Sequence, residues 1–122
     1  MKLEVGMYVR TKNRGIAKFR GWNAYDENKV AIHTHNEGDI EITPIIDKNT
    51  IIKASHNIID LIEEGDYVNR YPVYEIIEYE DNTRAIVIGD DNKSIIWEES
   101  SQYIKSIVTK EQFEEMSYKV GE

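Results

Sequence analysis

Apolar side chains recur along most of this chain with the two-residue period of a β-strand. Within 16–20, Ile16, Lys18 and Arg20 share one face while Ala17 and Phe19 share the other. Comparable alternating or continuous apolar runs, bounded by polar turn residues, predict further strands. These runs lie at 7–10, 29–33, 39–42, 50–53, 73–79, 84–88, 94–97 and 103–108. The loop 12–15 is polar and ends in Gly, so it predicts a β-hairpin between 7–10 and 16–20.

Helix signals are confined to two short segments. Asn57 as N-cap, an acidic residue three positions later and Gly65 as terminator predict one or two helical turns over 57–64. Thr109 and Gln112 have the spacing of a capping box and predict a short helix through Met116. The sequence therefore predicts a mainly β protein, with a small barrel-like or two-lobed antiparallel sheet and a short C-terminal helix.

One short motif occurs twice. Gly-x-Tyr-Val stands at 6–9 and again at 65–68, a spacing of 59 residues. A structural duplication would explain the match, and so would chance, since a turn glycine before a β-rich run is common. We therefore expect a single compact domain over 1–122, possibly made of two β lobes at 1–56 and 57–122.

Composition narrows the class of protein. The chain has 122 residues, 40% of them hydrophobic, with eight Tyr and two Trp, as in a folded globule. It has no Cys, which excludes disulfide scaffolds, thiolate metal sites and thiol catalysis. No apolar run approaches 18 residues and no apolar signal segment follows Met1, so we expect a soluble cytoplasmic protein.

Charge is distributed unevenly. The first twenty residues carry six bases and one acid, whereas the other 102 carry nine bases and 22 acids. With a pI near 4.9, the whole molecule is not expected to bind duplex DNA directly, because neutralised phosphates supply that affinity. The basic end has a complementary surface in the acidic remainder of a second copy, so we expect a homo-oligomer.

Catalytic and metal motifs are missing from the sequence. It contains no nucleophile elbow, Walker lysine loop or dinucleotide-binding glycine motif, so we expect no enzyme, no catalytic residues and no cofactor. His33 and His35, with Glu37, Asp39 or His56, fit solvent-facing positions better than a metal site. The acidic turn 90–92 lacks the alternate ligand spacing of a calcium loop, so no metal is expected there.

Basic and aromatic residues of the N-terminal hairpin form the best candidate site. Guanidinium groups match phosphate geometry, and nearby aromatic rings can stack on a base. The predicted ligand-binding residues are Tyr8, Arg10, Arg14, Lys18, Arg20 and Trp22. The alternative is that the aromatic side chains are core and the bases pair with the acidic body or a second subunit.

Three stretches, 5–12, 54–68 and 104–113, carry a resemblance. They resemble uncharacterised small proteins of phages and prophages of Gram-positive bacteria. The resemblance covers about a third of the chain. It implies a phage accessory protein in the cytoplasm of a bacterial host cell that counters host defence.

Two modes of action remain open at this point. The first is non-catalytic sequestration of a nucleotide-derived immune signal by the N-terminal hairpin. The second is an acidic, anti-CRISPR-like inhibitor that occupies the nucleic-acid-binding surface of a host effector. The acids offered for that role are Glu63, Glu64, Asp66, Glu78, Glu80, Asp81, Asp90 and Asp91. The expected partner is accordingly a small nucleotide ligand or a host defence protein, with no membrane partner.

Overall fold

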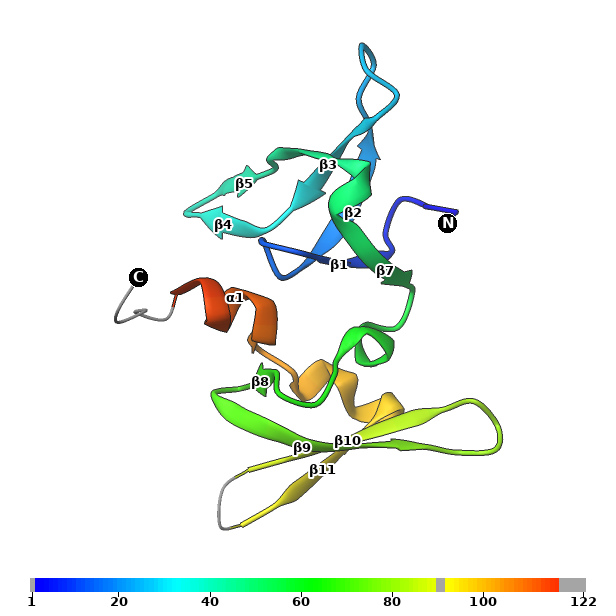
Figure 1. The fold of residues 1–122 in the computed structure, drawn as a ribbon, viewed down its shortest axis with the longest axis vertical. Coiled ribbons are helices and arrows are strands. Elements are labelled where there is room, and N and C mark those ends of the chain that lie inside the picture. Colours follow the sequence, from blue (N-terminus) through cyan, green and yellow to red (C-terminus); the bar gives the residue numbers. More distant parts are fainter. Residues whose placement is uncertain (1, 90–91, 117–122) are drawn as a thin grey trace. The chain divides into compact units, whose positions relative to one another are not determined.

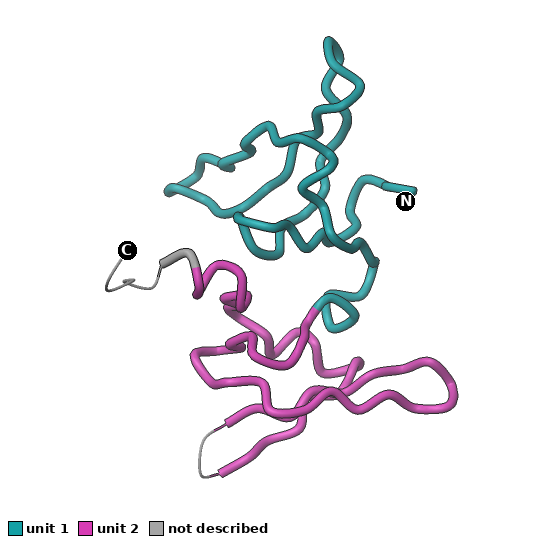
Figure 2. Tube along the Cα trace, in the orientation of Figure 1, with its two compact units in different colours: residues 1–61 teal, residues 62–122 magenta. Residues whose placement is uncertain are grey.

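The computed structural model describes residues 2–89 and 92–116 and divides the chain into two compact units (Figures 1 and 2). Unit 1 comprises residues 1–61 and unit 2 residues 62–122, whereas the sequence places the boundary between lobes at 56/57. The fold is mainly β, with 46% strand and 16% helix, which confirms the predicted class. The described strands form antiparallel sheets that do not close into a barrel.

Unit 1 is built on a five-stranded antiparallel sheet in the order β6-β3-β2-β1-β7 (Figure 1). Its strands are β1 (Tyr8–Thr11), β2 (Ile16–Trp22), β3 (Lys29–His33), β6 (Ile45–Asp47) and β7 (Ile51–Ser55). A separate two-stranded hairpin, β4 (His35–Glu37) with β5 (Ile40–Ile42), lies in sequence between β3 and β6. Two 3₁₀ helices, η1 (Lys48–Thr50) and η2 (Ile58–Leu61), precede and follow β7.

Unit 2 has a five-stranded antiparallel sheet in the order β11-β10-β9-β8-β12. Its strands are β8 (Tyr67–Val68), β9 (Tyr71–Glu78), β10 (Arg84–Ile88), β11 (Ser94–Trp97) and β12 (Ile107–Val108). The 3₁₀ helix η3 (Glu98–Tyr103) precedes β12 and the helix α1 (Lys110–Met116) follows it. None of the helices in the described ranges has the length and apolar character needed to cross a bilayer.

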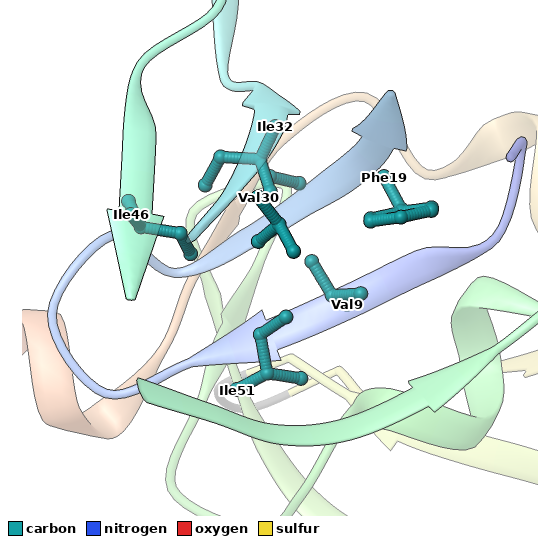
Figure 3. Close-up of a cluster of buried hydrophobic side chains, with 7 residues drawn as sticks. Val9, Phe19, Val30, Ile32, Ile46 and Ile51 are labelled. Carbon is teal, nitrogen blue, oxygen red and sulfur yellow. The ribbon is translucent and has the colours of Figure 1, made fainter. Parts of the chain in front are cut away.

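The core of unit 1 lies on one face of its sheet. Val9, Phe19, Val30, Ile46 and Ile51 point toward one another from five different strands (Figure 3). Val9 and Val30 are fully buried. The alternation of buried and less buried positions in β2 matches the period read from the sequence, because burying one face requires every second side chain to be apolar.

The two sheets share more than their strand order. Gly6 and Gly65, at φ +95° and +92°, begin equivalent turns before β1 and β8. Gly6 N–H donates to Phe19 O at 3.1 Å, and Gly65 N–H donates to Val73 O at 3.3 Å. The return bonds, from Phe19 N–H to Met7 O and from Val73 N–H to Asp66 O, are both 2.8 Å.

The same register continues into the next strand of each sheet. Phe19 pairs with Ile32 and Val73 pairs with Ile88. Each second strand then has a β-bulge at the following residue, Arg20 in β2 and Tyr74 in β9. Because the two units have the same strand order, the same turn hydrogen bonds and the same bulge position, unit 2 is a structural repeat of unit 1. In the sequence, the repeat is recognisable from the Gly-x-Tyr-Val motif.

The helices and strand ends depart from the expectations in two places. The segment 57–64 forms only the short 3₁₀ helix η2, and the strand expected at 103–108 is limited to β12 because η3 extends to Tyr103. The capping box is confirmed: Thr109 N–H donates to Gln112 Oε1 at 3.0 Å and Gln112 N–H donates to Thr109 Oγ1 at 3.3 Å. Residues 90–91 of the acidic turn lie outside the described residues.

Candidate functional site

A row of four polar or aromatic residues crosses the sheet face of unit 1 opposite the core. Ser55 of β7 pairs with Tyr8 of β1, Tyr8 pairs with Lys18 of β2, and Lys18 pairs with His33 of β3. All four side chains are half-buried. Because directly paired residues project to the same side of a sheet, this row defines what we call the Lys18 face.

Lys18 occupies the centre of the row. Its Nζ lies 5.4 Å from the centroid of the Tyr8 ring, which is a cation–π geometry. Lys18 thus lies over an aromatic ring and is paired across β2 and β3 with His33. This part of the face therefore offers a positive charge next to a flat apolar surface.

The β-bulge in β2 brings a second positively charged side chain, that of Arg20, to the Lys18 face. Bulges re-aim side chains, and Arg20 is the residue that the β2–β3 register skips. Arg20 Nε donates to Oε1 of Glu41 on β5, and His33 Nδ1 lies 3.8 Å from the same oxygen. His33 Nε2 also lies 2.8 Å from Asn36 Oδ1 on β4. The β4–β5 hairpin thus brings a carboxylate next to both the Arg20 guanidinium and the His33 imidazole.

Arg10 belongs to the same face but is buried, with 1% of its surface exposed. Its Nη1 donates to the carbonyl of Leu61 at 2.8 Å. Leu61 belongs to the 3₁₀ helix η2, which packs on β1 and β7. Two hydrogen bonds hold η2 there: Lys53 Nζ donates to Asp60 O, and Ser55 Oγ donates to Asp60 Oδ2. In this structure the guanidinium of Arg10 fastens η2 to the sheet.

The remaining two candidates lie away from the Lys18 face. Arg14 is exposed in the β1–β2 turn, where its N–H donates to Thr11 Oγ1 at 2.9 Å. Trp22 pairs with Val30, on the core side of the sheet, and packs edge-on against Phe19 at a centroid distance of 5.8 Å. The structure therefore groups Tyr8, Lys18 and Arg20, buries Arg10 under η2 and separates Arg14 and Trp22 from them.

Sequence reasoning did not connect His33 and Glu41 to this face. The sequence offers His33 only as a candidate metal ligand with His35, and Glu41 only as part of a strand. The connection requires the β2–β3 register and the insertion of the β4–β5 hairpin, both of which are set by long-range pairing. A basic residue in a β-bulge and an acidic residue on a separate hairpin have no characteristic spacing in the sequence, so their contact cannot be recognised from a motif.

The histidines do not converge on one point. His33 lies near Glu41, His35 Nε2 lies 3.5 Å from Glu37 and His56 Nε2 lies 3.3 Å from Glu4. Within the described ranges, no three His, Cys, Asp or Glu side chains come together as a metal site.

The charge asymmetry of the sequence is largely an asymmetry between units. Unit 1 contains nine basic and eight acidic residues, whereas unit 2 contains six basic and fifteen acidic residues. Attraction for an anion is therefore greater on unit 1, and attraction for a cation greater on unit 2.

Comparisons with protein-family models, with curated proteins and with solved structures give no match for this chain.

Proposed function

We propose that this protein is a non-catalytic, phage-encoded binding protein that counters host defence by sequestering a nucleotide-derived signalling molecule. The observation that carries the proposal is the Lys18 face, where an ammonium group lies over a phenol ring and the Arg20 guanidinium shares the Glu41 carboxylate with the neighbouring His33. Phosphate groups favour charge-assisted bonds from Lys and Arg, and nucleobases favour aromatic surfaces. A nucleotide carries both a phosphate group and a nucleobase, so it suits both features of the Lys18 face.

Glu41 shapes how such a ligand binds. Arg20 and His33 both lie next to its carboxylate, so an incoming phosphate exchanges with Glu41 as their partner. Glu41 is carried by the short β4–β5 hairpin, which pairs only with itself among the described strands. Because this hairpin is not part of the five-stranded sheet, its displacement leaves the sheet register intact.

Native mass spectrometry of the full chain, purified from bacteria that synthesise immune nucleotides, tests the proposal. We expect a retained small molecule, with its affinity lowered about tenfold or more by Lys18→Ala and by Arg20→Ala, since a hydrogen bond to a charged group contributes about 1.5–3 kcal/mol. Arg14→Ala is the matched control, because it removes an exposed base of the same hairpin outside the Lys18 face. A protein that retains nothing, or whose binding is unchanged in both variants, contradicts the proposal.

A second function is favoured by the acidic excess of unit 2: inhibition of a host effector through its nucleic-acid-binding surface. The structure reduces the acids available for this role. Asp66 is buried and accepts N–H groups of Glu63 and Lys110, while Glu78 lies 3.7 Å from Arg84. The exposed acids that remain among the described residues of the expected set include Glu64, Glu80 and Asp81.

The two functions separate in one assay. Reversal of charge at Glu80 and Asp81 to Lys abolishes effector inhibition in the second function and leaves nucleotide retention unchanged in the first. Lys18→Ala, in contrast, lowers nucleotide retention in the first function and leaves effector inhibition unchanged in the second.

A further inference from the structure

Unit 2 carries an aromatic surface that its fold does not require. Trp97 of β11 pairs with Ala85 of β10, and Ala85 pairs with Ile77 of β9. The next row of the same face contains Ile95, Val87 and Glu75. We call this the Trp97 face; within it Ala85 and Val87 are buried, and it lies opposite the row Ile76–Ile86–Ile96, in which Ile86 and Ile96 are buried and Ile76 is half-buried.

Two aromatic rings dominate the Trp97 face. Tyr79 stacks on Trp97 with a centroid distance of 5.7 Å and an interplanar angle of 22°. The two residues remain 38% and 40% exposed, and Ile95 in the neighbouring row is 48% exposed. Exposed aromatic clusters of this kind are typical of interaction surfaces, since water contact with large apolar groups is unfavourable.

The structural repeat shows that the sheet does not need these rings. In unit 1 the pairing of β3 with β6 places Lys29 opposite Asp47, at the positions that Ala85 and Trp97 hold in unit 2. Lys29 Nζ lies 3.9 Å from Asp47 Oδ2, an exposed ion pair. The same sheet is therefore compatible with a charged pair at this place, where the described part of unit 2 has Ala85 and Trp97.

Acidic residues follow both aromatic residues in the sequence, and one lies on the Trp97 face. Glu75 lies on the Trp97 face itself, Glu80 and Asp81 follow Tyr79 in the β9–β10 turn, and Glu99 follows Trp97 in the first turn of η3. Two hydrogen bonds from Thr83, the larger effect from its side chain and the smaller from its backbone, lower the pKa of the exposed Asp81 carboxyl below its ordinary value of 3.8. Asp81 therefore keeps its negative charge under ordinary conditions.

From this juxtaposition of stacked rings and acidic side chains, we infer that the Trp97 face binds an arginine-bearing segment of a partner protein. A guanidinium group stacks on aromatic rings while its N–H groups pair with carboxylates, so it satisfies both features of the surface. Unit 2 already contains a cation–π contact of the lysine type, because Lys93 Nζ lies 4.5 Å from the centroid of the exposed Tyr74 ring. The inference is independent of the nucleotide site proposed for unit 1.

Fluorescence anisotropy with labelled glycine–serine peptides tests this inference on the full chain at low salt. Three matched peptides carry arginine, lysine or citrulline at the same positions. We expect saturable binding in the order arginine, lysine, citrulline. Trp97→Ala and Tyr79→Ala each weaken binding of the arginine peptide about two- to fivefold, as expected for loss of an exposed cation–π contact.

Matched variants separate the surface from general charge effects. Tyr25→Ala removes a 98% exposed aromatic ring of unit 1, and Lys18→Ala alters the proposed nucleotide site, so both leave peptide binding unchanged. Asp81→Asn weakens the arginine and lysine peptides equally. Trp97→Phe keeps a ring at the site and restores most of the affinity lost in Trp97→Ala.

Several results overturn the inference. Equal binding of the arginine and citrulline peptides excludes recognition of the guanidinium, and absence of saturable binding excludes the site. If Trp97→Ala alters the circular dichroism spectrum, Tyr79→Ala decides, and wild-type affinity in that variant excludes the aromatic pair. Self-association of the free protein that Tyr79→Ala removes assigns the face to a second copy instead.

Discussion

Arg10 has a role in the structure that differs from the one its position in the sequence suggests. By sequence it is one of six bases in the first twenty residues, and by structure its guanidinium donates to the Leu61 carbonyl while 99% of its surface is removed from water. A buried charge is tolerated only where hydrogen bonds replace its hydration. Lys18, on the same face, keeps its ammonium beside Tyr8 and remains half-exposed. The difference is set by the position of η2 over β1 and β7.

Substitution of Arg10 tests this structural role. Arg10→Ala removes the donor to a buried carbonyl and the packing of the side-chain stem, so we expect a loss of about 2–4 kcal/mol in the free energy of unfolding. Arg14→Ala, at an exposed turn position of the same hairpin, stays within about 0.5 kcal/mol of the wild type. Urea unfolding followed by tryptophan fluorescence measures both, and equal midpoints for Arg10→Ala and wild type would contradict the assignment.

At the scale of elements, repeated local geometry produces two sheets of the same design. Each begins with a glycine turn, continues into a Tyr-Val strand and has a β-bulge in the strand that follows. The units differ in what is inserted: unit 1 adds the β4–β5 hairpin between β3 and β6, whereas in unit 2 only residues 89–93 separate β10 from β11. The insertion supplies Glu41 to the Lys18 face, so the difference between the units lies at the candidate site.

Substitutions of Gly6 and Gly89 by Ala are expected to differ in their cost to stability. At Gly89, with φ +125°, an added Cβ would lie 2.4 Å from the carbonyl oxygen of Asn92, whereas at Gly6, with φ +95°, it would meet no atom within 4 Å. We expect Gly6→Ala to cost about 1–2 kcal/mol from backbone strain alone. Gly89→Ala adds a steric clash and costs about 2–4 kcal/mol. Thermal unfolding compares them, and a Gly89→Ala variant as stable as Gly6→Ala would show that the backbone at Asn92 moves to accommodate the added Cβ.

At the scale of the whole molecule, charge divides the chain into a nearly neutral unit 1 and a strongly acidic unit 2. Within unit 1 the bases concentrate at the N-terminal hairpin, where Lys12 and Arg14 are exposed. Opposite charges on one chain favour association between copies, because each copy offers both surfaces.

Self-association is therefore expected to depend on salt. At micromolar concentration and low salt, sedimentation equilibrium should give a mass above the 14.2 kDa of one chain. Higher salt weakens the association, since the screening length falls from about 10 Å at 0.1 M to about 3 Å at 1 M. Combined Lys12→Glu and Arg14→Glu substitution should give the monomer at low salt. A wild-type protein that sediments only as a monomer under these conditions contradicts the expectation.

The sequence by itself determined the local features of this protein. The two-residue period predicted most of the strands, the Thr109–Gln112 spacing predicted the cap of α1, and the Gly-x-Tyr-Val motif marked the two equivalent turns. Each of these depends on interactions between residues close in the chain, or on one face of a strand being buried. Such constraints are recorded in the order of the side chains.

Only the tertiary structure decided which of the basic residues share a surface. Tyr8, Lys18 and His33 meet through strand pairing, Arg20 is redirected by a bulge, and η2 buries Arg10. The stacking of Tyr79 on Trp97 likewise joins residues from β11 and from the turn that follows β9. Register, bulges and the packing of a connecting helix depend on the free energy of the assembled sheet, which no single segment of sequence specifies.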